Sequence, residues 1–208
     1  MPDPVCVRCR GPLRTPEDAG HWTCEAHGVV EPLHPALPSE PYHLSDVASS
    51  SSVPVWLPWP IPLGWTVGGV RRTTGTGPSR AVAVGLLGPG VLARQAELVL
   101  VAEEPGVGLG ASYAGIGTAD PGPELTALAC DTKATADGHP TALWSLPVSD
   151  RAAYVGEASG RWLWFVAWPV TEWMVVHDDL RLVDVRAPEH RALLAELPVG
   201  PVSPRLAS

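Results

Sequence analysis

The chain begins with two short motifs of metal-ligating residues. Cys6 and Cys9 are separated by two residues, and Cys24 and His27 repeat this spacing after fourteen intervening residues. Zinc prefers four tetrahedral nitrogen and sulfur ligands, and a two-residue gap lets each pair bind one ion from a single tight turn. We therefore predict that Cys6, Cys9, Cys24 and His27 bind Zn²⁺.

The ligand set also indicates the role of the metal. Four protein ligands leave no coordination position for water, which is typical of a structural site and not of a catalytic one. A module as short as residues 1–35 has little core of its own, so zinc binding, on the order of 10 kcal/mol in such peptides, would supply its folding energy. His21 and His34 are rivals to His27, whose spacing matches the first motif.

A glycine-rich segment is the second candidate site. Gly106, Gly108 and Ala111 fit the GxGxxA pattern of loops that bind phosphate. That pattern must open a helix, and residues 112–117 do not have a helical sequence. Residues 105–124 are therefore predicted to form a long loop that does not bind a nucleotide.

Other polar residues could support catalysis only if the fold gathers them. Glu103 and Glu104 precede the glycine-rich segment, His139 follows a glycine turn, and residues 177–179 read His-Asp-Asp. Turns between strands normally carry solvated His and Asp side chains. The alternative hypothesis is an enzyme that uses the loop 103–111 together with His139.

Tryptophan is unusually frequent, with nine residues in the chain. Three of them, Trp56, Trp59 and Trp65, lie in the proline-rich segment 53–65, which the prolines predict to be extended. Large aromatic side chains usually form core, and one or two can anchor an interface. We consider Trp56 and Trp59, together with Glu103, Glu104 and His139, a possible partner or ligand surface. We expect most of the following tryptophans to be buried: Trp56, Trp59, Trp65, Trp144, Trp162, Trp164, Trp168 and Trp173.

Composition and periodicity predict a mainly β (α+β) fold. Abundant glycine and proline, 21 and 24 residues, favour short strands and turns over long helices. The sequence predicts a zinc ribbon over residues 1–35, a linker over 36–52 with one helical turn near residues 44–48, and an antiparallel β-meander domain over 53–208. That domain ends in a short helix over 188–197. Strands are expected over 65–74, 80–87, 97–101, 133–137, 140–146, 152–156, 161–168, 173–176 and 180–185.

The segment 161–168 is predicted to be a central strand. Trp162, Trp164, Val166 and Trp168 alternate with Leu163, Phe165 and Ala167, so both faces of this strand are apolar.

The net charge argues against some classes of partner. Fourteen basic and 22 acidic side chains give −8, which disfavours non-specific binding to nucleic acid or to an anionic membrane. Arg8, Arg10 and Arg14 cluster at the first motif, but acidic residues of the same module outnumber them. Nucleic-acid binding by the ribbon remains an alternative with little support.

Cellular location follows from two further features. The N-terminus has no signal-peptide pattern, and the longest apolar run, 162–170, is about half a membrane span. Thiol ligands persist in a reducing compartment, so we expect the cytoplasm. The fourth cysteine, Cys130, is expected to be a buried small hydrophobe.

The combination of motifs resembles an uncharacterised actinobacterial family of unknown function with an N-terminal zinc ribbon and a tryptophan-rich β domain. The resemblance covers nearly the whole chain apart from the linker, and it implies a cytoplasmic bacterial protein without implying an activity. It rests on Cys6-Val7-Arg8-Cys9, Cys24-Glu25-Ala26-His27-Gly28, Val53–Pro60, Val101–Gly110, Gly138-His139-Pro140 and Trp162-Leu163-Trp164.

The sequence thus favours a non-enzymatic zinc-ribbon protein whose β domain binds a partner protein or a small ligand. A closed metal site, an acidic balance and the lack of an assembled catalytic group support this hypothesis.

Overall fold

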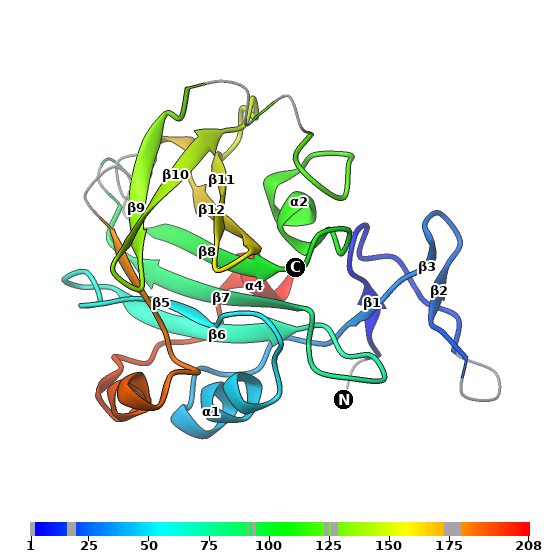
Figure 1. Cartoon of the computed structure of the whole chain (residues 1–208), viewed down its shortest axis with the longest axis horizontal. Helices are drawn as coiled ribbons and strands as arrows, with labels where there is room; N and C mark the ends of the chain where they lie inside the picture. Colours follow the sequence, from blue (N-terminus) through cyan, green and yellow to red (C-terminus); the bar gives the residue numbers. More distant parts are fainter. Residues whose placement is uncertain are drawn as a thin grey trace.

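The structure is a computed structural model of the whole chain that describes residues 3–15, 20–90, 92, 95–122, 125, 129–172 and 180–208. Nine strands form one curled sheet in the order β5-β13-β9-β10-β11-β12-β8-β7-β6 (Figure 1). The bounds are β5 (Trp56–Pro58), β6 (Thr66–Arg72), β7 (Ala81–Gly88), β8 (Ala96–Glu103), β9 (Thr132–Ala136), β10 (His139–Ser145), β11 (Ala152–Ala158), β12 (Arg161–Trp168) and β13 (Arg181–Asp184).

The sheet is not the continuous antiparallel meander that the sequence predicted. β6–β7–β8 and β9–β10–β11–β12 are meanders, and β12 joins them by pairing antiparallel with β8. β13 then returns to lie between β5 and β9, and it pairs parallel with β9. The expected strand over 173–176 lies outside the described residues. Parallel insertion of a last strand depends on tertiary packing, which strand periodicity does not report.

Strand β12 is central, as its two apolar faces predicted, with β11 on one side and β8 on the other. Leu163, Phe165 and Ala167 belong to a first core that includes residues of all nine strands, the inside of the curl. Trp164, Val166 and Trp168 belong to a second core on the opposite face. Burial on both faces explains why this strand lacks the polar alternation of a sheet exposed on one side.

Residues 36–52 are packed against the β domain and differ from the linker that the sequence predicted. Helix α1 (Pro41–Ser49) begins with proline at a first-turn position, and Leu44, Val47 and Ala48 enter the first core. Before the helix, Leu37 exchanges two backbone hydrogen bonds with Val70 of β6. The spacing of the three buried residues is helical, so their burial supplies the stabilisation that the intrinsic helix preference of this segment lacks.

The proline-rich segment enters the sheet at its edge. β5 is the outermost strand next to β13, and Pro58 is opposite Leu182. An edge position tolerates proline because one side of the strand needs no amide donors. The C-terminal part contains η2 (Val170–Glu172), a 3₁₀ helix η3 (Pro188–Glu196) where a short helix was expected, and α4 (Pro204–Ala207).

The N-terminal module, residues 3–15 and 20–34, contains two small antiparallel sheets. β1 (Val5–Cys6) pairs with β4 (Pro32–Leu33), and β2 (Thr23–Cys24) pairs with β3 (Gly28–Val29). After β4 the chain runs along β6, where the amide of His34 donates to the carbonyl of Arg72. The module therefore lies at β6, the edge strand at the opposite end of the large sheet from β5 (Figure 1).

None of the helices in the described ranges combines the length and apolar character needed to cross a membrane.

Candidate metal centre

The first ligand pair lies in a tight turn at the end of β1. The Cys6 amide donates to the carbonyl of Gly11, and the Arg10 amide donates to the carbonyl of Cys6, both at 2.9 Å. Arg10 has a left-handed backbone with φ of 61°. A Cβ atom at Gly11 would lie 3.3 Å from the Cys9 sulfur, so glycine lets the backbone close tightly around this thiol.

The second ligand pair lies in the β2–β3 hairpin. Cys24 ends β2, and His27 precedes Gly28, whose φ of 66° is the left-handed conformation that glycine adopts without strain. The hairpin therefore presents Cys24 and His27 from one turn, as the first motif presents Cys6 and Cys9.

The four side chains converge. The Nδ1 atom of His27 is 3.6 Å from the sulfur of Cys6 and 3.6 Å from that of Cys24. The sulfurs of Cys9 and Cys24 are 3.7 Å apart, and all four ligand atoms lie within 4.8 Å of one another. No cysteine forms a disulfide in the described residues. Cys6, Cys9, Cys24 and His27 therefore lie close enough to hold one metal ion.

The surroundings shift the pKa values of Cys6 and Cys24 in opposite directions. The hydrogen bond with His27 lowers the pKa of Cys24 to about 6, whereas burial raises the pKa of Cys6 to about 11. Without a cation, Cys6 would be a thiol at neutral pH, and a bound metal would deprotonate it. Cys6 and Cys24 are buried, His27 is half-buried and Cys9 is exposed, so the site lies at the edge of the second core.

The two rival histidines lie elsewhere. His34 Nε2 contacts the hydroxyl of Thr74, and His21 is exposed at a cleft beside the module. Neither belongs to the cluster of ligand atoms.

Two arginines of the first motif attach the module to the glycine-rich segment that follows β8. Arg8 donates from Nε to the carbonyl of Val107 at 3.2 Å and from Nη2 to the carbonyl of Gly106 at 2.5 Å. The guanidinium carbon of Arg10 lies 4.5 Å from the ring centroid of Tyr113. Burial lowers the pKa of Arg10. Both arginines thus help to hold the module in place.

Apolar contacts join the module to the same face of the sheet. Cys6, Val7 and Leu33 are buried in the second core together with Leu109 and Trp164. This core also contains residues from β7, β8 and β11. Because the ligand Cys6 is itself part of the core, the metal cluster and the packing of the module are directly linked.

The glycine-rich segment contains a helix, which corrects the prediction of a loop over 105–124. Helix α2 (Leu109–Ala114) follows β8, and Gly108 precedes it with a φ of 89°. The backbone thus follows the strand–glycine–helix order of a phosphate loop. The carboxylate of Glu103 occupies the helix start, however, accepting from the amides of Leu109 at 2.6 Å and Gly110 at 3.1 Å.

Glu103 is completely buried, and burial raises its pKa to about 8, against the opposing effect of the two amide hydrogen bonds. Because this side chain already fills the place where a phosphate would bind, the segment has no phosphate cradle. The structure assigns Glu103 to capping the helix.

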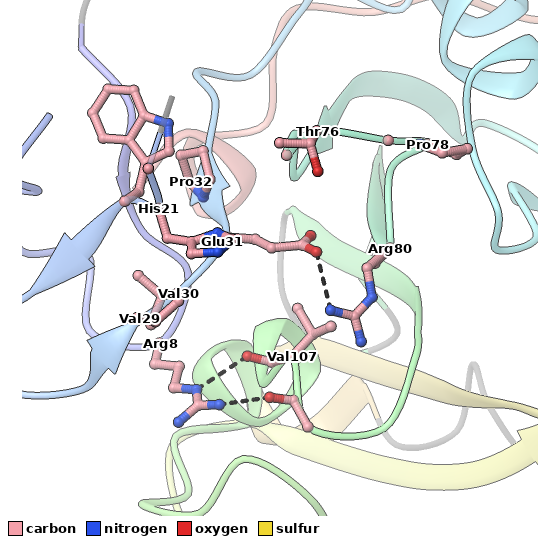
Figure 2. Close-up of a pocket in the computed structure, with 15 residues that line it drawn as sticks. Arg8, His21, Val29, Val30, Glu31, Pro32, Thr76, Pro78, Arg80 and Val107 are labelled. Atoms are coloured by element: carbon pink, nitrogen blue, oxygen red, sulfur yellow. Dashed lines mark hydrogen bonds and ion pairs between the residues drawn. The ribbon is translucent and has the colours of Figure 1, made fainter. Parts of the chain in front are cut away.

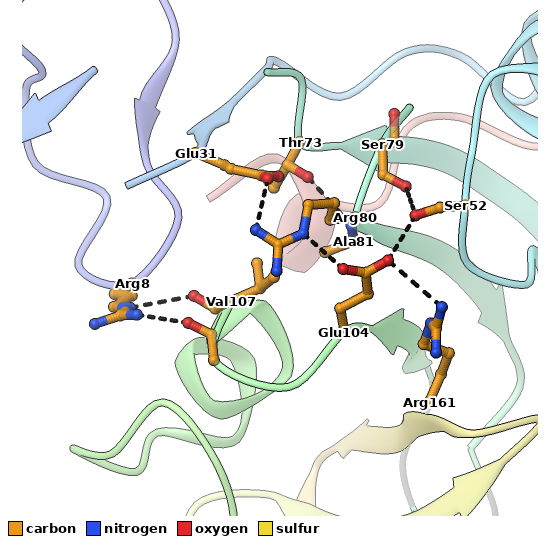
Figure 3. A network of polar contacts seen from close by, with 11 residues as sticks. Arg8, Glu31, Ser52, Thr73, Ser79, Arg80, Ala81, Glu104, Val107 and Arg161 are labelled. Carbon is orange, nitrogen blue, oxygen red and sulfur yellow. Dashed lines mark hydrogen bonds and ion pairs between the residues drawn. The ribbon is translucent and has the colours of Figure 1, made fainter. Parts of the chain in front are cut away.

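Glu104 lies in an ionic network between the sheet and the module (Figure 3). Arg80 donates to Glu104 Oε2 at 2.7 Å and to Glu31 Oε1 at 3.1 Å, and Ser52 donates to Glu104 Oε1 at 3.0 Å. Arg161 lies 3.5 Å from the same carboxylate. Partial burial raises the pKa of Glu104, but the hydrogen bonds and charges of Arg80 outweigh this effect and the pKa is lowered.

The remaining candidates do not assemble into one site. Trp56 is 2% exposed and belongs to the first core, so it cannot form a surface, and Trp59 packs half-buried against it. His139 is exposed at the start of β10, which two strands, β11 and β12, separate from β8. Cys130 is half-buried, not fully buried as expected. Trp173 and His177-Asp178-Asp179 lie outside the described residues.

A cleft between the module and the sheet was not expected from the sequence. It has a volume of about 550 Å³. His21 and Glu31 come from the module, and Thr76 and Arg80 come from the β6–β7 connection. No local motif could have identified these residues, because they are far apart in the sequence and are gathered only by docking of the module.

Comparison with known proteins identifies the family of the chain. No curated protein and no solved structure matches the chain. A family model described as a family of unknown function, DUF6758, matches residues 1–206. The match includes the N-terminal module and the curled sheet together, so the chain belongs to the DUF6758 family.

Proposed function

We propose that Cys6, Cys9, Cys24 and His27 bind one structural zinc ion, and that the protein is a non-enzymatic binding module for a partner protein or a small ligand. The observation that carries the proposal is the convergence of three sulfurs and one imidazole nitrogen within 4.8 Å, at a module that packs on the sheet.

The spacing of the ligand atoms supports zinc. Tetrahedral Zn²⁺ binds sulfur at about 2.3 Å and nitrogen at about 2.0–2.1 Å, which separates two sulfurs by about 3.8 Å and a sulfur from the nitrogen by about 3.6 Å. The sulfurs of Cys9 and Cys24 are 3.7 Å apart, and Cys6 and Cys24 each lie 3.6 Å from the His27 nitrogen. A larger cation with oxygen ligands does not suit this donor set.

A structural role follows from the closed ligand set and from the size of the module. The strands β1 to β4 each contain two residues, too few to fold by their own hydrogen bonds. Metal binding would therefore stabilise the module and, through Arg8, Arg10 and Cys6, its attachment to the second core. Thiolate ligands require a reducing environment, which makes the cytoplasm the proposed location.

The structural roles of the candidate catalytic residues support binding rather than catalysis. Within the described residues, Glu103 caps a helix, Glu104 bonds Arg80 and His139 is on a separate hairpin, so these three do not form an acid–base site. Arg8 and Arg10 serve internal contacts, which argues against the nucleic-acid alternative. The cleft beside the module has the volume of a small-molecule site.

Metal analysis of the purified protein tests the zinc assignment. We expect about one zinc per chain, and Cys24→Ser should release it, since three ligands hold the ion far more weakly. Cys130→Ser is the matched control because Cys130 is outside the cluster, and it should keep its zinc. A wild-type protein free of zinc after expression in zinc-containing medium, or full zinc in Cys24→Ser, would contradict the assignment.

A further inference from the structure

The cleft between the N-terminal module and the sheet has two walls of different origin. Residues 20–22 and 29–32 form one wall, and the glycine turn 75–78 with Arg80 forms the other (Figure 2). Arg8, Gly106 and Val107 close the third side. Sites for small molecules are concave, partly apolar and contain a few convergent polar groups, and this cleft meets each condition.

One side of the cleft presents a positive charge. Arg8 uses Nε and Nη2 for the neutral carbonyls of Val107 and Gly106, and no carboxylate of the described residues forms an ion pair with it. Figure 2 shows its guanidinium at the side of the cleft opposite Thr76. Neutral carbonyls orient this group without cancelling its charge.

The net charge inside the cleft is opposite to that of the protein. Together with the ion pairs behind Arg80, three arginines (Arg8, Arg80 and Arg161) face two glutamates (Glu31 and Glu104), which leaves one positive charge within a chain of net charge −8. A local positive potential in an acidic protein selects a small anion and disfavours a large anionic polymer, which the rest of the surface repels.

The cleft also contains an unused hydrogen-bond acceptor. Glu31 Oε1 accepts from Arg80, whereas Oε2 is buried and has no partner among the described residues. A buried carboxylate oxygen without a donor is costly, and the Glu31 side chain as a whole is 18% exposed. A rotation of the carboxylate that brings Oε2 to the cleft would let a ligand hydroxyl or amine satisfy it. Figure 2 shows the Glu31 side chain extending through the middle of the cleft towards Arg80.

We propose that this cleft binds a small organic anion that carries a carboxylate or phosphate group together with a hydroxyl or amino donor. Arg8 would bind the anionic group, and the Glu31 carboxylate, after this rotation, would accept from the donor. Thr76 would add a hydroxyl contact from the opposite wall. This inference rests on the proposed function, because the metal centre holds the module that forms two sides of the cleft.

Calorimetric titration of the metal-loaded protein with three related probes tests the proposal. Gluconate supplies a carboxylate with hydroxyl donors, glucose 6-phosphate supplies a phosphate with the same donors, and glucose supplies the donors alone. We expect at least one of the anions to bind and glucose to bind at least about tenfold more weakly, since charge-assisted hydrogen bonds are the stronger ones. Absence of binding by both anions, or equal binding of glucose, would overturn the proposal.

Three variants locate the binding site. Arg8→Gln should weaken the anion about tenfold or more, whereas Arg14→Gln removes the same charge from an exposed residue outside the cleft and should leave the affinity unchanged. Gly75→Leu places a side chain in the cleft beside Glu31, because a Cβ at Gly75 would lie 3.8 Å from Glu31 Oε1, whereas Arg8 bonds Gly106 and Val107. It should abolish binding.

Zinc content, measured on each sample, separates the two proposals. Loss of binding in Gly75→Leu with zinc retained supports the cleft, and unchanged affinity in Gly75→Leu contradicts it. Wild-type protein that holds zinc but binds neither anion would overturn the cleft proposal alone. Wild-type protein without zinc would contradict the proposed metal centre.

Discussion

The guanidinium carbon of Arg10 lies 4.5 Å from the centre of the Tyr113 ring, and this contact joins the metal-binding turn to helix α2. Tyr113 in turn donates its hydroxyl to the carbonyl of Leu206 at 3.0 Å. The N-terminal module, the helix after β8 and the C-terminal segment are therefore linked through one aromatic side chain. The turn that carries Cys6 and Cys9 is thus connected to both of these segments.

Arg10→Met should lower the free energy of unfolding by about 1–2 kcal/mol. Methionine keeps much of the apolar length of arginine but loses the cation–π contact, which is worth most where the cation is desolvated. Arg14→Met is the matched control in the same module, because Arg14 is exposed. Urea denaturation of the three proteins measures the difference. Equal destabilisation by both substitutions would show that the Tyr113 contact has no specific role.

The buried carboxyl of Glu103 predicts a pH-dependent stability. Its folded-state pKa of about 8 lies above the ordinary value of 4.5, so the folded protein holds a proton that the unfolded chain releases. The stability contributed by this group is fully present below about pH 4.5 and is lost as the pH rises through about 8.

Comparison with Glu103→Gln isolates this effect, since glutamine does not titrate. The free energy of unfolding of the wild type minus that of the variant should fall between pH 5 and pH 9, as measured by denaturation in matched buffers. A difference that grows with pH would mean that the amide bonds from Leu109 and Gly110 keep Glu103 ionised.

Gly110→Ala should destabilise the protein by about 1–3 kcal/mol through overpacking. An added Cβ would lie 2.2 Å from the indole carbon Cδ1 of Trp164, which is completely buried. The same substitution at Gly117, where no atom lies within 4 Å of the added Cβ, should change stability by less than about 0.5 kcal/mol. Thermal denaturation compares the two, and a neutral Gly110→Ala would contradict the close packing of α2 on β12.

Removal of the metal should loosen one part of the molecule before the rest. Hydrogen exchange should accelerate in β1 to β4 and in α2, because the second core loses Cys6, Val7 and Leu33 when the module opens. β9 and β10 belong to the same sheet but contribute no residue to the second core, so they should stay protected. Uniform acceleration across the sheet would instead indicate one cooperative unit.

The sequence predicted best those features that depend on residues close together in the chain, namely the metal-ligand spacing and the alternation of side chains along a strand. The spacing of Cys6, Cys9, Cys24 and His27 predicted side chains that converge in the structure, because each pair needs only one turn. The alternation along residues 161–168 predicted a central strand with two buried faces, and β12 has them. The two-residue repeat of a strand can be recognised within a few residues.

Long-range contacts explain what the sequence did not predict. Helix α2 is only six residues long, and its N-cap residue, Gly108, has no side chain that could cap it. The cap is the Glu103 carboxylate at the end of β8, which no capping motif in the sequence indicates. Helix α1 was expected as one turn of a linker, although the spacing of Leu44, Val47 and Ala48 is a signal that could have identified it. The parallel pairing of β13 with β9 and the cleft at the module depend on tertiary contacts alone.

X-ray absorption at the zinc edge tests the central claim most directly. For the wild-type protein we predict three sulfur neighbours at about 2.3 Å and one nitrogen neighbour at about 2.0–2.1 Å, with about one zinc per chain. His27→Cys should convert the spectrum to four sulfurs, since the fourth ligand position would then be a thiolate. A spectrum dominated by oxygen neighbours, or one that His27→Cys leaves unchanged, would contradict a structural zinc held by Cys6, Cys9, Cys24 and His27.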